Sequence, residues 1–377
     1  MSGFFVAPRF AWGPGAIEVL SGLGFRRATL LVDPEVARRD GARWIAEELE
    51  KGSAAVTVEI ADGRPPSVDA ARALGARLAA APPEALVAVG GGRTIDTAKA
   101  AWLAAKVPGV PLAELPPLLE VPAGGPRLIA VPTTSGSGSE ASGTADLVRE
   151  DGTPVELAHR ALVPDWALVD PAFAETLAPA VVVDGAFETL ALAVEAYLSA
   201  WSGPLSDALA LDAATTVLRR LPHAVRWSDD PEARAALHYA ASAAGLAASN
   251  AQRGIAHALA RALEGPTGLP YARLLGIGLP AVLEFDLPSA RDRLETLAER
   301  ARRPDDRDDR PLSARLGRLR ETVGAPASVR AARGRIDWTE AERAAIVERT
   351  VRAPGALGNP RVPTRADVAA MVERIRG

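Results

Sequence analysis

Three consecutive glycines interrupt the stretch Val89-Gly90-Gly91-Gly92-Arg93-Thr94-Ile95-Asp96-Thr97-Ala98-Lys99. They lie between a predicted buried strand, residues 85–89, and a predicted helix, residues 93–106. Glycine lets the backbone approach a ligand closely and adopt a positive φ. The free amides and the dipole of a helix N-terminus favour a pyrophosphate. A plain tight turn is the alternative, but a strand before the glycines and a helix after them are the context that a phosphate-binding loop requires.

The segments on either side of this turn alternate between short apolar runs and amphipathic helical patterns. Helices are predicted over 34–51 and over 67–81, the second with Ser67 as N-cap. Such alternation is typical of a mostly parallel sheet with helices on both faces, a Rossmann-like α/β domain. The predicted strands are residues 28–32, 54–60, 85–89, 128–131 and 167–169.

The second half of the chain lacks strand patterns and favours an all-helical domain. A length of 377 residues suggests two domains, and we predict them as 1–178, the α/β domain, and 179–377, the helical domain, with the boundary near 170–184. The mixed-charge stretch Arg302–Arg310 is predicted to be an exposed loop. Ala/Leu-rich helices are expected over 187–201, 206–220, 232–250 and 254–264.

Composition excludes several kinds of site. The chain has no cysteine, which removes disulfides, iron–sulfur clusters and thiolate zinc sites, and it has only four histidines. The formal net charge of −4 gives no basic field for nucleic acid or anionic lipid. Without a signal-peptide layout or a long apolar run, we expect a cytoplasmic protein that makes no membrane contact.

A second candidate binding element is the hydroxyl- and glycine-rich stretch 131–140, which follows the predicted strand 128–131. Its hydroxyl groups are suited to donate hydrogen bonds to a phosphate, a ribose or a carboxamide. A flexible linker is the alternative reading of the same composition.

A third element is Asp33, at the end of the predicted strand 28–32. An acidic residue there accepts hydrogen bonds from a ribose 2′-hydroxyl and repels a 2′-phosphate, which favours NAD, with NADP as the alternative. Asp33 as the N-cap of the helix that begins at Pro34 is a structural alternative. The predicted cofactor-binding residues are Asp33, Gly90, Gly91, Gly92, Thr94, Asp96, Thr133, Thr134, Ser137 and Ser139.

Through the glycine turn, the hydroxyl-rich stretch and several further motifs, nearly the whole chain resembles the iron-containing (group III) alcohol dehydrogenases, a family that includes glycerol dehydrogenases. The resemblance implies an NAD(P)-dependent alcohol–carbonyl oxidoreductase with an N-terminal Rossmann-like domain, a helical C-terminal domain and an active site in the cleft between them. It rests on Trp12-Gly13-Pro14-Gly15, GGGRTIDTAK at 90–99, PTTSGSGSE at 132–140, Leu168-Val169-Asp170-Pro171, Val194-Glu195-Ala196-Tyr197-Leu198-Ser199 and Asn359-Pro360-Arg361.

The chain departs from the family at the metal. The family holds Fe(II) or Zn(II) with one Asp and two or three His. In the register of the resemblance, the metal Asp falls on Glu188 and the His one helical turn later falls on Leu192. His257 matches a metal His, and the last metal His falls on Tyr271.

Leucine is no ligand, neutral tyrosine is a poor one, and a catalytic divalent ion normally needs three protein ligands. We therefore expect no metal. An unusual ligand set built on Glu188 and His257 is the alternative.

Four residues of the altered site are predicted to be catalytic: His257, Arg261, Tyr271 and Glu188. Arg261, where relatives carry a second His near the substrate, is suited to binding a carboxylate or polarising a carbonyl. His257 or Tyr271 would move the proton. The structural alternatives are an Arg261–Glu188 ion pair that fills the vacated site and packing roles for the two rings.

Two functions therefore compete. The first is a metal-independent NAD(P) oxidoreductase acting on a small-molecule or peptide alcohol or carbonyl. The second is a non-catalytic or accessory protein that keeps the fold. Divergent relatives stand beside peptide-modifying enzymes in daptide-type pathways, which is the reason to include a peptide substrate. A homo-oligomer, most simply a dimer, is expected.

Overall fold

The computed structural model describes residues 5–116, 119–302 and 308–377. The chain divides into two compact units, one reaching Thr176 and the other beginning at Leu177. Each unit has its own hydrophobic core. Most of the predicted loop 302–310 lies outside the described residues.

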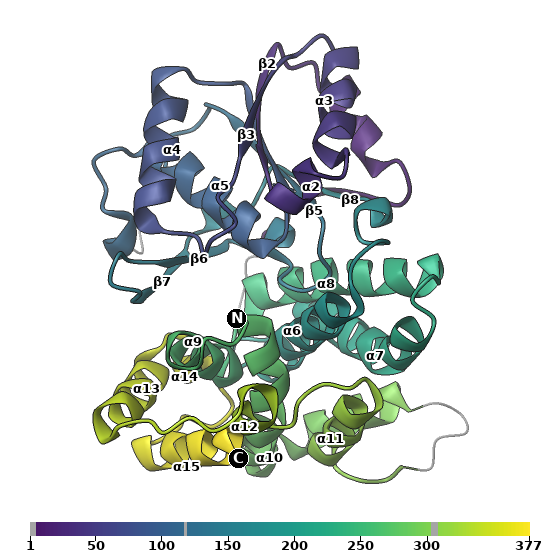
Figure 1. The fold of residues 1–377 in the computed structure, drawn as a ribbon, viewed down its shortest axis with the longest axis vertical. Coiled ribbons are helices and arrows are strands. Elements are labelled where there is room, and N and C mark those ends of the chain that lie inside the picture. The colour runs from purple at the N-terminus through teal and green to yellow at the C-terminus, as the bar shows by residue number, and fades with distance from the viewer. Residues whose placement is uncertain (1–4, 117–118, 303–307) are drawn as a thin grey trace. The chain divides into compact units, whose positions relative to one another are not determined.

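The N-terminal unit is built on a parallel sheet, in the strand order β1-β8-β5-β4-β2-β3 (Figure 1). This confirms the α/β fold class. An antiparallel ribbon of β6 and β7, which the sequence patterns did not indicate, forms a second small sheet. The strands are β1 (Arg9–Trp12), β2 (Arg27–Val32), β3 (Ala55–Ile60), β4 (Ala85–Gly90), β5 (Arg127–Pro132), β6 (Thr144–Val148), β7 (Pro154–Ala158) and β8 (Trp166–Val169).

Helices cover both faces of the sheet because alternate residues of each strand point to opposite sides. Leu86 and Ala88 of β4 pack in the core formed with α4 (Val68–Ala80) and α5 (Gly92–Lys106). Val87 and Val89 pack instead in the core formed with α1 (Val19–Gly22) and α3 (Gly41–Lys51). Every residue of β4 is buried, so this strand lies at the centre of the unit.

The prediction of one continuous helix over 34–51 is wrong. The chain forms α2 (Pro34–Ala37) and then α3, with Asp40 between them in the left-handed region at φ 60°. At Gly41 an added Cβ would lie 2.5 Å from Cγ1 of Val36, so the start of α3 packs against Val36 too closely for a side chain at position 41. The local amphipathic period does not reveal this break. The N-cap prediction at Ser67 is confirmed, since its hydroxyl accepts from the Ala70 amide at 3.1 Å.

The C-terminal unit is helical, as predicted, and the four expected helices are all present with longer bounds. Residues 271–301 form the longest helical segment, which has a non-helical residue at Ala290 shortly after Pro288. The helices are α6 (Pro179–Leu198), α7 (Pro204–Arg226), α8 (Pro231–Ala251), α9 (Ile255–Thr267), α10 (Tyr271–Ala301), α11 (Leu312–Thr322), α12 (Val329–Arg333), α13 (Glu340–Arg352), α14 (Gly355–Gly358) and α15 (Arg365–Arg376).

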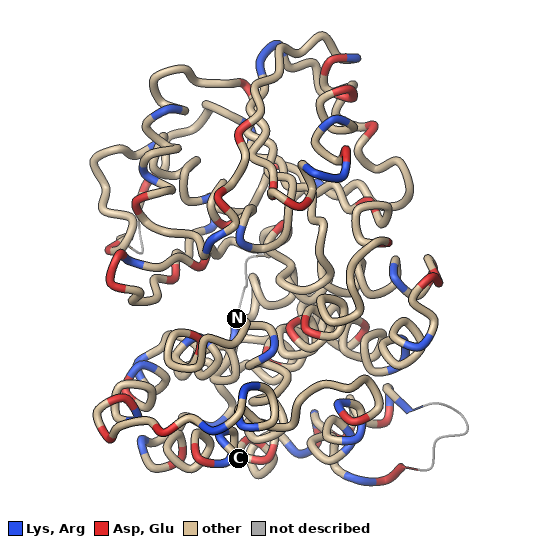
Figure 2. The backbone as a smooth tube through the Cα atoms, in the orientation of Figure 1, with Lys and Arg blue, Asp and Glu red and all other residues tan. Residues whose placement is uncertain are grey.

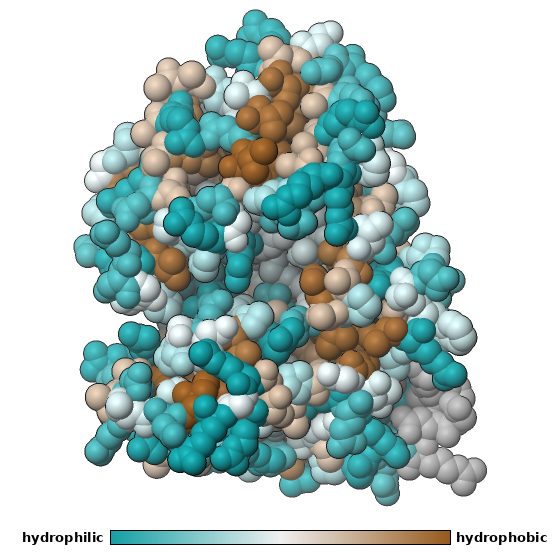
Figure 3. Space-filling view, in the orientation of Figure 1, coloured by the Kyte–Doolittle hydropathy of each residue, from teal (hydrophilic) through white to brown (hydrophobic). Residues whose placement is uncertain are grey.

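Lys and Arg residues as well as Asp and Glu residues occur along the backbone of each unit (Figure 2). Hydrophobic side chains are exposed near the edge strand β3, where Val58 and Ile60 are 48% and 61% exposed (Figure 3). Among the described helices, none is long and apolar enough to cross a membrane.

Candidate active site

The carboxyl ends of β2, β4 and β5 meet at one edge of the N-terminal sheet. The Asp33 amide donates to the Val89 carbonyl at 2.9 Å, and the Thr133 amide donates to the Gly90 carbonyl at 3.0 Å. Asp33, Gly90 and Thr133 therefore lie side by side. In the strand order of this sheet the direction of winding reverses at the neighbouring strands β2 and β4, and crevices at such reversals are where open α/β sheets bind ligands.

The glycine turn needs glycine for space. The expectation of positive φ is wrong here, because Gly90, Gly91 and Gly92 are absent from the positive-φ glycines of the chain. An added Cβ at Gly91 would lie 2.9 Å from Oγ1 of Thr134, and one at Gly92 would lie 2.6 Å from Oγ of Ser137. The turn is packed against the hydroxyl-rich loop so closely that no side chain fits between them.

The hydroxyl-rich loop is an ordered part of the core edge, which argues against the flexible-linker reading. Thr133 and Ser139 are each 5% exposed. A short 3-10 turn, Ser139–Ala141, follows Gly138, whose φ of 58° lies in the left-handed region. Since the first turn of α5 begins at Gly92, the loop and the helix N-terminus form one continuous polar surface.

Asp33 has the structural role of a helix N-cap, which was the alternative to its predicted role in cofactor binding. Its Oδ1 accepts from the Glu35 amide at 2.8 Å, so it is the N-cap of α2. Its Oδ2 accepts from the Thr94 hydroxyl at 3.4 Å, which ties β2 to the first turn of α5. Capping uses only part of a carboxylate's acceptor capacity, so a ribose hydroxyl still has lone pairs to bind.

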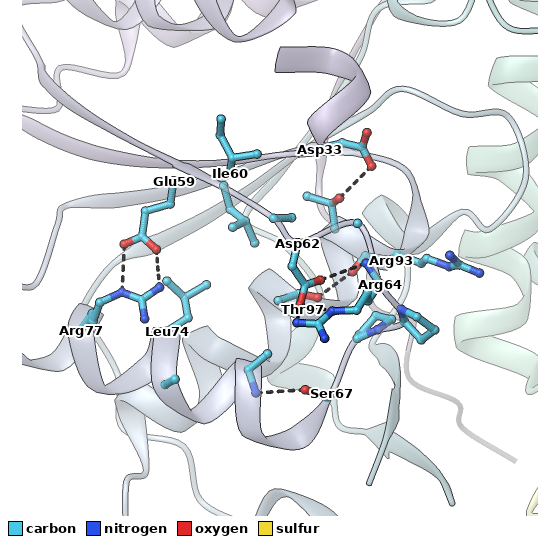
Figure 4. A pocket seen from close by; sticks show the side chains of 18 residues that line it. Asp33, Glu59, Ile60, Asp62, Arg64, Ser67, Leu74, Arg77, Arg93 and Thr97 are labelled. Atoms are coloured by element: carbon cyan, nitrogen blue, oxygen red, sulfur yellow. Dashed lines mark hydrogen bonds and ion pairs between the residues drawn. The ribbon is translucent and has the colours of Figure 1, made fainter. Parts of the chain in front are cut away.

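A pocket of about 220 Å³ opens beside Asp33, with Thr94, Thr97 and Arg93 on the α5 side (Figure 4). Its other wall is the segment after β3, where the Arg64 Nη2 lies 3.1 Å from Oδ2 of Asp62. Only Asp33 and Thr94 of the predicted cofactor residues line it. The pocket thus extends the predicted site toward β3.

Asp96 and Lys99 face away from this pocket into the protein. Asp96 is 7% exposed, and its Oδ2 accepts from the Asp146 amide at 3.0 Å. Burial raises the pKa of Asp96 to about 6, partly offset by the positive charge of Lys99, which lowers it. Lys99 is fully buried. The prediction that Asp96 serves the cofactor therefore concerns a side chain that already binds the backbone of β6.

In the C-terminal unit, His257 on α9 is buried against Glu195 on α6. The imidazole Nδ1 is hydrogen-bonded to Oε2 of Glu195, and the Glu195 Oε1 accepts from the amides of Ala256 at 2.6 Å and His257 at 3.2 Å. An ionised Glu195 makes Nδ1 the donor of this hydrogen bond. The Nε2 atom is buried and has no hydrogen-bond partner among the described residues.

Glu195 is held in its charged form. Burial by itself would raise its pKa, but the neighbouring His257 and the backbone amides at the start of α9 outweigh burial and leave the pKa below its ordinary value. The positive end of the α9 dipole adds to this stabilisation. A buried charged carboxylate behind an imidazole fixes both the tautomer and the orientation of the ring.

Asn359 connects this pair to a second buried carboxyl group. Its Nδ2 donates to Oδ1 of Asp286 at 2.6 Å, and its Oδ1 accepts from the Ile255 amide at 3.4 Å. Gly254 completes the packing, because an added Cβ there would lie 2.9 Å from Oε1 of Glu195 and 3.0 Å from Oδ1 of Asn359. Burial, with the nearby Glu195 charge, raises the pKa of Asp286 to about 7, although the Asn359 amide lowers it.

The raised pKa of Asp286 predicts a pH-dependent stability. Since the folded pKa exceeds the unfolded one, protonated Asp286 contributes stability that is complete below about pH 4 and lost as the pH rises through about 7. The loss is on the order of a few kcal/mol. We expect Asp286→Asn, which keeps an acceptor for Asn359, to flatten the fall in Tm between pH 4 and 7. Exposed Asp292→Asn on the same helix is the control, and parallel Tm curves for Asp286→Asn and wild type would contradict the assignment.

Tyr271 and Arg261 lie beside His257. The Arg261 guanidinium carbon is 4.1 Å from the centre of the Tyr271 ring, and the His257 and Tyr271 rings meet edge-on with centroids 6.0 Å apart. The Arg261 Nη1 is also 3.4 Å from Oε2 of Glu264. The structure therefore brings together three of the four residues predicted to be catalytic.

Glu188 comes from the same helix as Glu195. It is half-buried and stands two turns before Glu195 on α6, on the same helix face. Between them lies Leu192, which is buried and has no atom that binds a metal. Within the described part of the chain, no group of three or more His, Asp or Glu side chains is arranged to hold an ion.

Three residues of these sites escaped the sequence reasoning. Glu195 and Asn359 lie inside stretches that carry the family resemblance, and Lys99 ends the glycine-turn motif, but no pattern linked them to a partner. For Glu195 and Lys99 the available signal was a charged residue within an apolar helical run, which is unusual unless the residue is paired. What each one pairs with depends on packing between distant segments.

Comparison with known proteins matches both halves of the chain to one family. A profile described as "Iron-containing alcohol dehydrogenase" matches residues 8–171, and its companion, "Fe-containing alcohol dehydrogenase family, C-terminal", matches residues 182–375. The chain is 30% identical to the probable alcohol dehydrogenase EutG of Salmonella typhimurium over 97% of this chain and 92% of that protein. It is 28% identical to the 1-propanol dehydrogenase PduQ of Citrobacter freundii over 99% and 98% of the two chains.

Solved structures agree with the sequence matches. The fold is similar to that of an iron-containing alcohol dehydrogenase from Thermococcus thioreducens, with a TM-score of 0.89 and 27% identity over 99% of both chains. It is also similar to the crystal structure of a 1,3-propanediol oxidoreductase, with a TM-score of 0.90 and 25% identity over the full length of both chains.

Proposed function

The chain belongs to the iron-containing alcohol dehydrogenase family, and from this membership we propose that it interconverts an alcohol and a carbonyl with NAD(H) without the metal that the family normally uses. Membership itself makes the protein an NAD(P)-dependent alcohol dehydrogenase-like enzyme, which argues against the non-catalytic alternative. The observation that carries the metal-free part is the donor set, in which Leu192 and Tyr271 occupy two ligand positions.

The residues present do not fit a catalytic divalent ion. Of the four positions, only Glu188 and His257 carry good ligand atoms, whereas a catalytic site normally supplies three. The Tyr271 ring is covered by the Arg261 guanidinium, and a cation beside a metal ion opposes the binding of that ion. No step of the proposed reaction is therefore assigned to a metal.

The proposed cofactor site is the crevice of the N-terminal unit. Gly90, Gly91 and Gly92 with the first turn of α5 would receive the pyrophosphate, and Asp33 would accept from the adenosine ribose. Further donors would come from the neighbouring hydroxyl groups of Thr94, Thr133, Thr134, Ser137 and Ser139. Asp96 lies on the buried side of the same site. The Asp33 carboxylate supports NAD over NADP because it repels a 2′-phosphate.

The proposed chemistry belongs to the cluster in the C-terminal unit. In alcohol oxidation a bound nicotinamide would accept the carbon-bound hydride, and a base of this chain would accept the hydroxyl proton. Glu195 holds the His257 ring through Nδ1, and Nε2 has no hydrogen-bond partner among the described residues, which favours His257 over Tyr271 for this step. Arg261 would orient the carbonyl or a substrate carboxylate and stabilise the developing oxyanion. Glu188 completes the proposed set.

The proposed substrate is a small alcohol or aldehyde, and the proposed assembly is a homodimer. Relatives are named for small alcohols such as 1-propanol, and a small alcohol or aldehyde is the first substrate class for this chain. A peptide-borne alcohol or carbonyl is the second. A homodimer is supported by the edge strand β1, whose Trp12 is 71% exposed.

The proposal is tested by metal analysis and cofactor titration of the purified protein. We expect well below one equivalent of iron or zinc, and activity that a chelator leaves unchanged. The dissociation constant for NADPH should exceed that for NADH about tenfold or more. The Asp33→Ala variant should reduce this ratio of dissociation constants. One equivalent of metal whose removal abolishes turnover would overturn the metal-free assignment, and equal affinities would overturn the role of Asp33.

A further inference from the structure

Lys99 is a fully buried lysine that the proposed function does not use. Removing an ammonium group from water costs several kcal/mol unless hydrogen bonds and an opposite charge compensate. Here the Nζ donates to the Ser142 carbonyl at 2.7 Å, to the Ser142 hydroxyl at 3.1 Å and to the Thr144 carbonyl at 2.9 Å. Three acceptors match the three N–H groups of the ammonium. Because the ammonium group is hydrogen-bonded to three acceptors of the protein, the role of Lys99 is structural.

Asp96, one turn earlier on the same helix, holds the same loop at other points. Its Oδ2 accepts from the Asp146 amide at 3.0 Å, and the neighbouring Ser139 side chain lowers the pKa of this carboxyl group by hydrogen bonding to its charged form. Lys99 supplies the nearby positive charge that an ionised buried carboxylate needs. Two side chains of α5 therefore hold the segment from Ser139 to Asp146, which runs from the hydroxyl-rich loop into β6.

The held segment continues directly into the proposed cofactor site. The Ser139 amide donates to the Ser137 hydroxyl at 3.3 Å, and Ser137 is the residue that excludes a Cβ at Gly92. Serine and glycine bring little apolar surface, so the loop cannot hold this position by hydrophobic packing. The hydrogen bonds of the buried Lys99 and Asp96 side chains hold the loop in place of the hydrophobic packing that it lacks.

We propose that Lys99, with Asp96, is a positioning residue that fixes the loop 133–144 against the glycine turn and thereby sets the affinity for the nicotinamide dinucleotide without touching it. This inference rests on the proposed dinucleotide site. It also explains why α5 both presents its N-terminus to the cofactor and carries charges on its buried face. The helix and the loop then move as one body.

The test compares Lys99→Met with Lys106→Met on the same helix. Methionine keeps the apolar stem at Lys99 and removes the three donated hydrogen bonds. Lys106 is the matched control, since its Nζ lies 4.8 Å from the centre of the Trp102 ring and binds the Gly124 carbonyl outside the loop. Dissociation constants for NADH are measured by fluorescence titration, and amide hydrogen exchange is followed by mass spectrometry.

We expect Lys99→Met to raise the NADH dissociation constant about tenfold or more, which corresponds to about 1.4 kcal/mol, while Lys106→Met leaves it unchanged. Exchange should accelerate in 133–148 but stay slow in β2 and β4, and kcat at saturating cofactor should remain within about twofold. General loosening would instead accelerate exchange throughout the sheet. Unchanged affinity and unchanged exchange in folded Lys99→Met would overturn the inference.

If Lys99→Met does not fold, Ser142→Ala decides the question. This variant removes one acceptor of the ammonium and leaves the backbone carbonyls in place. It should weaken NADH binding by a few fold and accelerate exchange in the same segment, and wild-type values for both would overturn the inference. Failure of the wild-type protein itself to bind any nicotinamide dinucleotide would instead refute the proposed function.

Discussion

Replacing Gly91 by valine is expected to weaken NADH binding by about a hundredfold or more, equivalent to about 2.7 kcal/mol. A Cβ at this position would lie 2.9 Å from Oγ1 and 3.2 Å from Cγ2 of Thr134, and valine adds two more carbons. Either the turn or the threonine must then move, and both line the proposed pyrophosphate site. Fluorescence or calorimetric titration with NADH measures the loss.

Gly109→Val provides the matched control. Gly109 follows the same helix, is exposed, and has nothing within 4 Å of an added Cβ, so NADH affinity should be unchanged. Cooperative thermal unfolding followed by circular dichroism shows whether Gly91→Val has folded. Wild-type NADH affinity in folded Gly91→Val would place the dinucleotide elsewhere.

Replacing His257 by asparagine is expected to lower kcat by about 10²- to 10⁴-fold, the usual contribution of a general acid–base group. Asparagine keeps a donor near the position of Nδ1 for Glu195 but removes the buried Nε2. NADH affinity should remain near that of the wild type because the proposed phosphate site lies in the N-terminal unit. Steady-state kinetics and NADH titration together measure the two effects.

Three companion variants separate the roles within the cluster. Tyr271→Phe keeps the ring beneath Arg261 and loses only the hydroxyl, so a small effect supports His257 as the proton carrier. Arg261→Ala should lower turnover while leaving NADH binding nearly unchanged. Exposed His223→Asn on α7 is the control. Full activity of His257→Asn would show that the chemistry takes place away from this cluster, and loss of NADH binding would show a structural role.

Local signals explain which parts of the fold were predictable. The strand–glycine–helix sequence around Gly91 and the acidic residue Asp33 at a strand end follow from turn chemistry and strand periodicity, which act within a few residues. The α/β and helical halves followed from the same short-range patterns. The break between α2 and α3 did not, because it lies in the left-handed backbone of Asp40, which an amphipathic period does not indicate.

The metal-site departure was also readable from the sequence, since it needs only residue types at positions set by the family pattern. Leucine at 192 has no ligand atom wherever it lies. The sequence left open what fills the altered site. The structure shows Arg261 stacked on Tyr271 and paired with Glu264, two contacts that no sequence pattern indicated.

By itself the sequence determined the division into an α/β half and a helical half, the position of the glycine turn and the loss of ligand atoms at the metal positions. Only the tertiary structure decided that Glu195 binds His257, 62 residues away, that Asn359 binds Asp286, and that Lys99 is buried against the loop it holds. Periodicity tells which face of a helix is buried, but not which distant segment packs there. A buried charge finds its partner only when both segments are packed together, because burial is what makes an unpaired charge too costly to leave.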